Sequence, residues 1–343
     1  MKFKKVSVAS LGYAMPPHVI SSDSIEVRLA PVYERLGLQP GRLELMTGIR
    51  ARRAFDDGTM PSAVATAAGR AALDGAPELK SRIGCVIHAS VCRDFLEPAS
   101  ANLVHEALGL SKHAAVFDVS NACLGVLNGM LIVANMIELG QIDAGLVVSG
   151  EIGKPLLDAT IEGLLADENL TRRSIKGAFA SLTIGSGAAA VLLSRHDLVP
   201  PESDHRLVGA TLLAATEHNA LCRGGESGAA VNMNTDAEAL LHAGLDLAAA
   251  NWASFVDETE FGAPDRVVTH QVGKAHHALL CERLGVRAGS AYVSFDRLGN
   301  IGSAALPMSL ALAVEEGFVT RGHRVALLGI GSGLSSIMLA VKW

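Results

Sequence analysis

Short, continuous apolar runs alternate along the chain with longer apolar stretches of helical length. The runs IGCVIH at 83–88 and AGLVVSG at 144–150 are apolar at almost every position. This pattern is typical of strands that are buried on both faces, whereas strands with one solvated face alternate between apolar and polar residues. Buried strands that alternate with helices predict an α/β fold whose sheets carry helices on both sides.

The same succession of elements occurs twice. Residues 117–150 and 295–331 both begin with Phe-Asp, continue through a long apolar stretch that ends near a Glu and a Gly, and finish in a buried strand. Such self-similarity indicates an internal duplication. The flanking strands match in the same order, pairing 83–88 with 265–270, 6–12 with 206–215 and 188–194 with 335–341.

We therefore expect two related halves, 1–196 and 197–343, each with about five strands. The boundary falls in HDLVPPESDH at 196–205, a polar stretch with a Pro pair. Residues 153–182 are more polar and irregular, and we interpret them as a lid or cap attached to the first half. The uncharged run 119–137 approaches the length of a membrane span, but its Asn and Gly residues favour a buried central helix.

Composition narrows the possible partners. The chain has 343 residues, a formal net charge of −6 and no run rich in Lys or Arg, which argues against nucleic acid as a ligand. An anionic ligand such as coenzyme A remains compatible with a local basic patch. Five cysteines without a C-x-x-C pair argue against a zinc site and a disulfide framework. We expect a reducing, cytoplasmic setting, no bound metal, and an N-terminus that forms a strand and not a signal peptide.

Cys123 is the candidate nucleophile. It lies in DVSNACLG at 118–125, between a strand and the start of the long apolar helix. Free N–H groups at a helix start favour a thiolate and stabilise an oxyanion, so this position predicts a lowered pKa for the Cys123 thiol. The alternative interpretation is an inert core cysteine, which is common for this residue type.

Two further candidates come from the second half. His270 ends the strand at 265–270, and Asn300 occupies the turn that matches the turn of Cys123. The alternative role for Asn300 is a helix N-cap, and His88, which matches His270 in the first half, is interpreted as structural. The glycine-rich GIGSG at 329–333 precedes a strand, so it fails the dinucleotide-binding pattern and predicts a tight strand-to-strand turn.

Charged residues supply the remaining candidates. Arg50 and Arg53 in TGIRARR, together with Arg223, are candidates for holding an anionic carrier, although solvated surface is the simpler interpretation. Glu97, in the segment RDFLEP, lies in the longest insertion of the first half relative to the second. Its apolar neighbours predict a buried carboxyl group with a raised pKa.

Taken together, TGI-x-x-R at 47–53, Asn-Ala-Cys at 121–123, His-Gln at 270–271, Gly-Asn at 299–300 and the glycine turn at 329–333 resemble the β-ketoacyl synthase III group of the thiolase superfamily. The resemblance implies a duplicated thiolase fold, with two five-stranded mixed sheets and helices in layers (αβαβα). It also implies a catalytic triad of Cys123, His270 and Asn300. The oxyanion hole would use the backbone N–H groups of Cys123 and of a residue near Ser332.

The segments SVCRDFLEP at 90–98, LCRG at 221–224 and LLGIGSGL at 327–334 are similar to OleA-type enzymes within that group. The tryptophan that decarboxylating synthases carry before TGI is absent here, since 42–46 reads RLELM. This likeness implies a non-decarboxylative Claisen condensation of two acyl-CoA thioesters, with no permanently bound cofactor. Glu97 would then be a base that reaches across a homodimer interface into the partner's site.

Three alternatives remain open from the sequence. A decarboxylating β-ketoacyl-ACP synthase III, acting on acyl-ACP or malonyl-ACP, would not need Glu97. A Cys-His-Asn hydrolase is disfavoured by the duplicated α/β pattern, and a non-catalytic subunit is disfavoured by the complete Cys, His and Asn set. The acyl chain length, the carrier and any downstream partner enzymes are not indicated by the residues.

Overall fold

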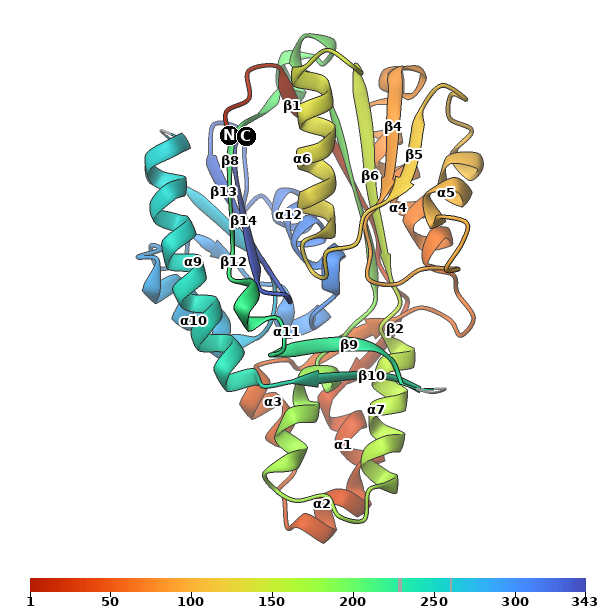
Figure 1. The fold of residues 1–343 in the computed structure, drawn as a ribbon, viewed down its shortest axis with the longest axis vertical. Helices are drawn as coiled ribbons and strands as arrows, with labels where there is room; N and C mark the ends of the chain where they lie inside the picture. Colours follow the sequence, from red (N-terminus) through yellow and green to blue (C-terminus); the bar gives the residue numbers. More distant parts are fainter. Residues whose placement is uncertain (228–229, 260) are drawn as a thin grey trace.

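A computed structural model of the chain describes residues 1–227, 230–259 and 261–343 (Figure 1). Its main sheet has ten strands in the order β12-β11-β13-β14-β8-β1-β7-β6-β4-β5. The strands of the first half are β1 (Val6–Ala14), β4 (Ile83–His88), β5 (Ala115–Asp118), β6 (Ala144–Glu151) and β7 (Gly187–Arg195). Those of the second half are β8 (His205–Ala214), β11 (Arg266–Thr269), β12 (Ala291–Tyr292), β13 (Arg324–Gly331) and β14 (Ser335–Lys342).

The expectation of two separate five-stranded sheets is wrong, because the halves form one continuous mixed sheet. Strands β1 and β8 pair antiparallel through Ser7 with Arg206 and Val8 with His205. Each would otherwise be the edge strand of its half, and pairing satisfies backbone groups that an open edge leaves unpaired. The duplication is still visible, since five strands lie on each side of this short seam in the same topological order.

The two halves enclose one shared core. The long helices α6 (Gly125–Glu138) and α12 (Ala305–Glu315) lie in its middle, and their side chains pack against strands of both halves. Helices α4 (Pro61–Asp74) and α5 (Ser100–Leu108) cover the outer face of the first half. Helices α9 (Ala237–Thr259) and α10 (Lys274–Arg283) cover the second (Figure 1). Most of the uncharged run 119–137, from Gly125 onward, therefore lies in a buried central helix, as predicted.

A smaller unit lies at one end of the layers, at the bottom of Figure 1. Helices α1 (Ser22–Arg28), α2 (Ala30–Leu36) and α3 (Arg42–Thr47) pack there on α7 (Lys154–Ala166) and α8 (Phe179–Leu182). Region 153–182 is thus more regular than its polarity suggested, because Leu157, Ile161 and Leu164 give α7 an apolar face.

The remaining elements are short. Two small antiparallel sheets complete this end, one of β2 (His18–Ser21) with β3 (Ala51–Ala54) and one of β9 (Cys222–Ser227) with β10 (Ala230–Thr235). A short helix, α11 (Phe295–Leu298), precedes the Asn300 turn. Within the residues described, no helix has both the length and the apolar character to cross a membrane.

Candidate active site

Cys123 lies in a turn immediately before α6, which begins at Gly125. The preceding residue, Ala122, has a φ of 45°, in the left-handed region that residues with a Cβ rarely adopt. The side chain of Asn121 donates to Asn128 Oδ1 at 2.8 Å, which ties this turn to the helix. The half-buried Cys123 is therefore held at the helix start by a strained turn, slightly earlier in the chain than predicted.

The electrostatic environment of Cys123 differs from the expectation. Burial, together with the nearby Glu151 and Cys222, raises the pKa of the Cys123 thiol to about 12. The prediction of a lowered pKa considered only the helix start. Burial and the nearby carboxyl group destabilise the thiolate more than the positive end of the helix stabilises it. Cys123 therefore rests as a neutral thiol, and its attack requires a proton acceptor.

The turn between β13 and β14 passes beside the nucleophile. A Cβ placed on Gly331 would lie 3.5 Å from the backbone N of Cys123 and 3.0 Å from Leu124 Cγ. The two strands pair antiparallel around this turn, so the predicted strand-to-strand connection is confirmed. Ser332 follows at the tip of the turn, and its hydroxyl donates to Cys222 Sγ at 3.3 Å.

His270 directly follows β11 and is locked against β13. Its backbone N–H donates to Leu328 O at 2.9 Å, on the strand that leads to Gly331. Its side chain is 4% exposed, and among the described residues its Nδ1 has no hydrogen-bond partner. Burial, together with the neighbouring His276, lowers the pKa of His270 to about 3. The imidazole is therefore neutral, with one N–H donor and one acceptor nitrogen.

The Asn300 turn contacts the start of α6. Asn300 Oδ1 accepts from the N–H of Gly302 at 3.0 Å, so the cap-like role considered for Asn300 is present. That bond uses the amide oxygen and does not involve the two N–H donors of Nδ2. Ser303 Oγ accepts from the N–H of Val126 at 2.9 Å, which joins this turn to the first turn of α6. The segments that carry Cys123 and Asn300 are thus in direct contact.

Glu151 is a buried carboxyl group that the sequence analysis did not single out. It ends β6, and its Oε1 accepts from Val91 N at 2.9 Å and Ser303 N at 3.1 Å. Its Oε2 accepts from Cys92 N at 3.2 Å. Burial raises the pKa of Glu151, while these donors oppose the rise. The available signal was an acidic residue closing the otherwise apolar strand AGLVVSGE.

Glu97 lies on an exposed loop between β4 and α5. The adjacent Phe95 and Leu96 are 48% and 93% exposed. The apolar burial expected around Glu97 is therefore not provided by its own chain, because its neighbours point outward and do not pack over it.

The three candidate arginines each have a partner within the chain. Arg50 pairs with Asp296 at 2.9 Å, Arg53 donates to a backbone carbonyl at 3.0 Å, and Arg223 donates to Asn219 Oδ1 at 3.0 Å. Arg223 lies on β9, and Arg53 lies on β3. A carrier-binding role for these residues stays a prediction. Within the described part of the chain, no cluster of His, Cys, Asp or Glu could hold a metal ion.

This fold, with a cysteine at the start of one central helix and a matching turn at the other, is that of a condensing enzyme. Residues 117–214 match the family model of 3-oxoacyl-[acyl-carrier-protein] synthase III, and residues 260–343 match the model of its C-terminal part. The chain belongs to this 3-oxoacyl-ACP synthase III family, within the thiolase superfamily.

Its full-length relatives give a narrower likeness. The chain is 40% identical to the acyl-CoA:acyl-CoA alkyltransferase of Shewanella oneidensis and 39% identical to that of Xanthomonas campestris, in each case over 100% of both chains. The structure of cerulenin-bound X. campestris OleA superposes with a TM-score of 0.94 at 39% identity, covering 100% of this chain and 98% of the other. A 3-oxoacyl-ACP synthase III, FabH, of Xanthomonas oryzae superposes with a TM-score of 0.94 at 38% identity, covering 100% of both.

Proposed function

We propose that this chain condenses two acyl-CoA thioesters without decarboxylation, giving a β-keto thioester or acid through an acyl-Cys123 intermediate. The observation that carries the proposal is the full-length identity of 40% to an acyl-CoA:acyl-CoA alkyltransferase. The Cys, His and Asn residues of the resemblance are all present in the sequence. The Asn300 turn contacts the start of α6, and His270 binds β13, the strand that leads to Gly331 beside Cys123. Long-chain acyl groups and a place in olefin biosynthesis are the matching expectations for substrate and pathway.

In the first half-reaction, the Cys123 sulfur attacks the carbonyl carbon of an acyl-CoA. The raised pKa of Cys123 means that its proton must be taken up, and the neutral imidazole of His270 is the acceptor that we assign to this step. The oxyanion is held by the backbone N–H groups of Cys123 and Ser332. The carbon–sulfur bond to coenzyme A then breaks, and coenzyme A leaves as a thiol with the transferred proton.

In the second half-reaction, another acyl-CoA binds with its carbonyl oxygen facing the N–H donors of His270 and Asn300. A base removes its α-proton, and we assign that role to Glu97. The carbanion attacks the acyl-Cys123 carbonyl, so that a carbon–carbon bond forms and the bond to sulfur breaks. The Cys123 thiolate leaves and takes up a proton, which balances the α-proton held by Glu97, and the β-keto thioester is released or hydrolysed by water.

A homodimer forms part of the proposal, because Glu97 is exposed on its own chain. Strand β5 lies at the end of the ten-stranded sheet, and its outer edge is available for pairing with a second copy. The exposed Phe95 and Leu96 beside Glu97 supply apolar surface for the same contact. Solved structures of X. campestris OleA include forms with one glutamate, one histidine or one cysteine substituted, the residue types proposed here.

The second candidate function is a decarboxylating β-ketoacyl-ACP synthase III. It is favoured by the family model and by the equal structural likeness to the X. oryzae FabH. Such an enzyme forms its carbanion by loss of carbon dioxide from a malonyl group, so it does not need a base to remove an α-proton.

Incubation of the purified protein with a single acyl-CoA, followed by mass analysis of products and peptides, separates the two functions. We expect one acyl adduct on the Cys123 peptide and a β-keto product built from two identical acyl groups. Glu97→Gln should leave the adduct and lower condensation by roughly 10²–10⁴-fold, as is typical for loss of a general base. Product formation only when a malonyl donor is added would instead establish the decarboxylating synthase.

A further inference from the structure

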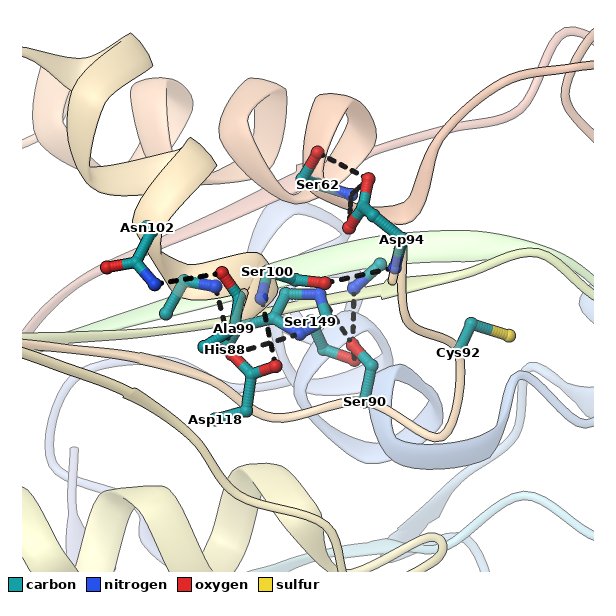
Figure 2. Close-up of polar contacts among 12 residues, drawn as sticks. Ser62, His88, Ser90, Cys92, Asp94, Ala99, Ser100, Asn102, Asp118 and Ser149 are labelled. Carbon is teal, nitrogen blue, oxygen red and sulfur yellow. Dashed lines mark hydrogen bonds and ion pairs between the residues drawn. The ribbon is translucent and has the colours of Figure 1, made fainter. Parts of the chain in front are cut away.

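The segment that carries Glu97 is an arm, residues 91–98, which follows β4 and ends shortly before helix α5. Its tip is exposed, since Leu96 is 93% exposed and Phe95 48%. The position of the Glu97 carboxylate must therefore be set at the base of the arm and not by packing at the tip. Three carboxyl groups hold the attached ends of the arm, those of Asp94, Asp118 and Glu151. Figure 2 shows the first two.

Asp94 anchors the middle of the arm to helix α4. Its carboxylate accepts from the backbone N of Ser62 at 3.2 and 3.3 Å and from the Ser62 hydroxyl at 2.7 Å. The N-cap residue of α4, Met60, supplies no side-chain cap, so Asp94 takes the place of one from a distant part of the chain. A carboxylate is favoured there by both the unpaired N–H groups and the positive helix end.

Asp118 anchors the end of the arm in the same way. It accepts from the backbone N of Ser100 and of Ala101, each at 2.9 Å, at the start of α5, whose N-cap Ala99 has no capping side chain. Ser100 then links the two anchors, because its hydroxyl accepts from the backbone N of Asp94 at 3.1 Å (Figure 2).

Glu151 anchors the beginning of the arm. It binds the backbone N of Val91 and of Cys92, and its third partner is the backbone N of Ser303 in the Asn300 turn. One buried carboxyl group therefore connects the arm to the turn that contacts the start of α6. No step of the proposed reaction uses Asp94 or Glu151 as a proton carrier.

We propose that Asp94 and Glu151 are positioning residues for the condensation step, which act by holding the arm so that Glu97 is presented in a fixed place. This inference rests on the proposed function, in which Glu97 is the base. A base must lie within hydrogen-bond reach of the proton that it removes, and a displacement of about 1 Å costs as much as roughly 10²-fold in rate. Helix starts and a buried strand end are rigid supports for such a group.

The test is a double-mutant cycle that measures the two half-reactions separately. Asp94→Ala and Glu151→Ala are each made alone and in the Glu97→Gln background. We expect each single change to lower condensation by roughly 10–100-fold. Asp94→Ala should leave acylation of Cys123 within about twofold. Glu151→Ala should not lower acylation, because it removes a carboxyl group that raises the pKa of the Cys123 thiol. In the Glu97→Gln background, neither change should lower condensation further, because residues that act through one group are not additive.

Conservative and matched variants control for loss of folding. Asp94→Asn and Glu151→Gln keep an acceptor oxygen and should restore part of the condensation rate. Glu138 is a carboxylate that accepts two backbone N–H groups at 2.9 Å elsewhere, from Lys4 and Lys5, so Glu138→Ala should change neither half-reaction.

The outcomes separate this inference from the proposed function. Full additivity with Glu97→Gln, or an equal loss of acylation and condensation, would overturn the positioning role while leaving Glu97 as the base. If Glu97→Gln alone leaves condensation unchanged, the assignment of Glu97 in the proposed function fails, and the positioning role fails with it.

Discussion

His88 and His270 end matching strands in the two halves of the molecule, and their surroundings differ. His88 is 1% exposed and lies in a polar network, with Nε2 3.2 Å from Ser90 Oγ and Nδ1 4.0 Å from Asp118 Oδ1 (Figure 2). His270 is buried to a similar degree, yet its Nδ1 has no hydrogen-bond partner among the described residues. Burial lowers the pKa of both.

The two halves of the duplicated fold therefore use matching strand ends for different purposes. In the first half the strand end is filled by Ser90, Asp118 and Ser149, which join β4, β5 and β6 and support the base of the arm. In the second half the same place is left with an unsatisfied imidazole nitrogen. Buried polar groups are normally paired, so an unpaired one is a candidate for contact with a ligand. This supports the structural interpretation of His88 and the catalytic proposal for His270.

The largest expected difference between the two halves comes from removing each imidazole in turn. His270→Ala should lower condensation by roughly 10²–10³-fold, the usual loss for one donor to a developing oxyanion. His88→Ala should have a much smaller effect on the rate per folded molecule. Steady-state condensation with one acyl-CoA, normalised to folded protein by circular dichroism, measures both. Equal losses in the two variants would contradict the proposal that His270 is catalytic and His88 structural.

The next effect concerns the nucleophile supplied by the first half. Because burial and Glu151 raise the pKa of Cys123 to about 12, its thiolate fraction should increase roughly tenfold per pH unit over the range in which the protein is folded. Alkylation of the Cys123 peptide by iodoacetamide, followed by mass spectrometry from about pH 7 to pH 10, should rise without a plateau. A plateau below pH 8 would show that the pKa of Cys123 is lowered, as the helix start alone predicts.

A smaller effect tests whether the network around His88 supports the fold. Ser90→Ala removes the hydroxyl that contacts His88 and Ser149 and that accepts from the backbone N of Gly150 at 2.9 Å. Leaving those buried groups unpaired should lower the free energy of unfolding by about 1–3 kcal/mol. Urea denaturation measures it, with the exposed Ser174→Ala, expected within about 0.5 kcal/mol of wild type, as the control. A loss no larger than that control would contradict a structural role.

The smallest effect is the contribution of His270 to acid sensitivity. Its folded pKa of about 3 lies below the ordinary value of 6.5, so the unfolded chain binds the proton first. Stability from this group is fully present above pH 6.5 and is lost as pH falls from there toward 3. Between pH 7 and pH 6 the loss should be under about 1 kcal/mol. His270→Asn should flatten that slope in thermal unfolding, and an unchanged slope would show that His270 does not titrate as assigned.

Much of the fold was predictable from apolar runs alone. The run 83–88 is β4, the run 335–341 lies within β14, and the turn at 329–333 connects two antiparallel strands, because buried strands and glycine turns have local signatures. The union of the two sheets was not predictable. It depends on two residue pairs between β1 and β8. These strands are far apart in the chain, and neither sequence indicates which strand it will pair with.

The candidate site was likewise predictable only in part from the sequence. The sequence by itself determined the residue types and their order, with Cys123, His270 and Asn300 each placed at the end of a recognisable element. Only the tertiary structure decided that Cys123 is a high-pKa thiol, that Glu97 projects from its own chain, and that Glu151 joins the arm to the Asn300 turn. The physical reason is that helix starts and strand ends are set by neighbouring residues. Burial, charge proximity and backbone contacts depend on segments far apart in the chain, which meet only when it is folded.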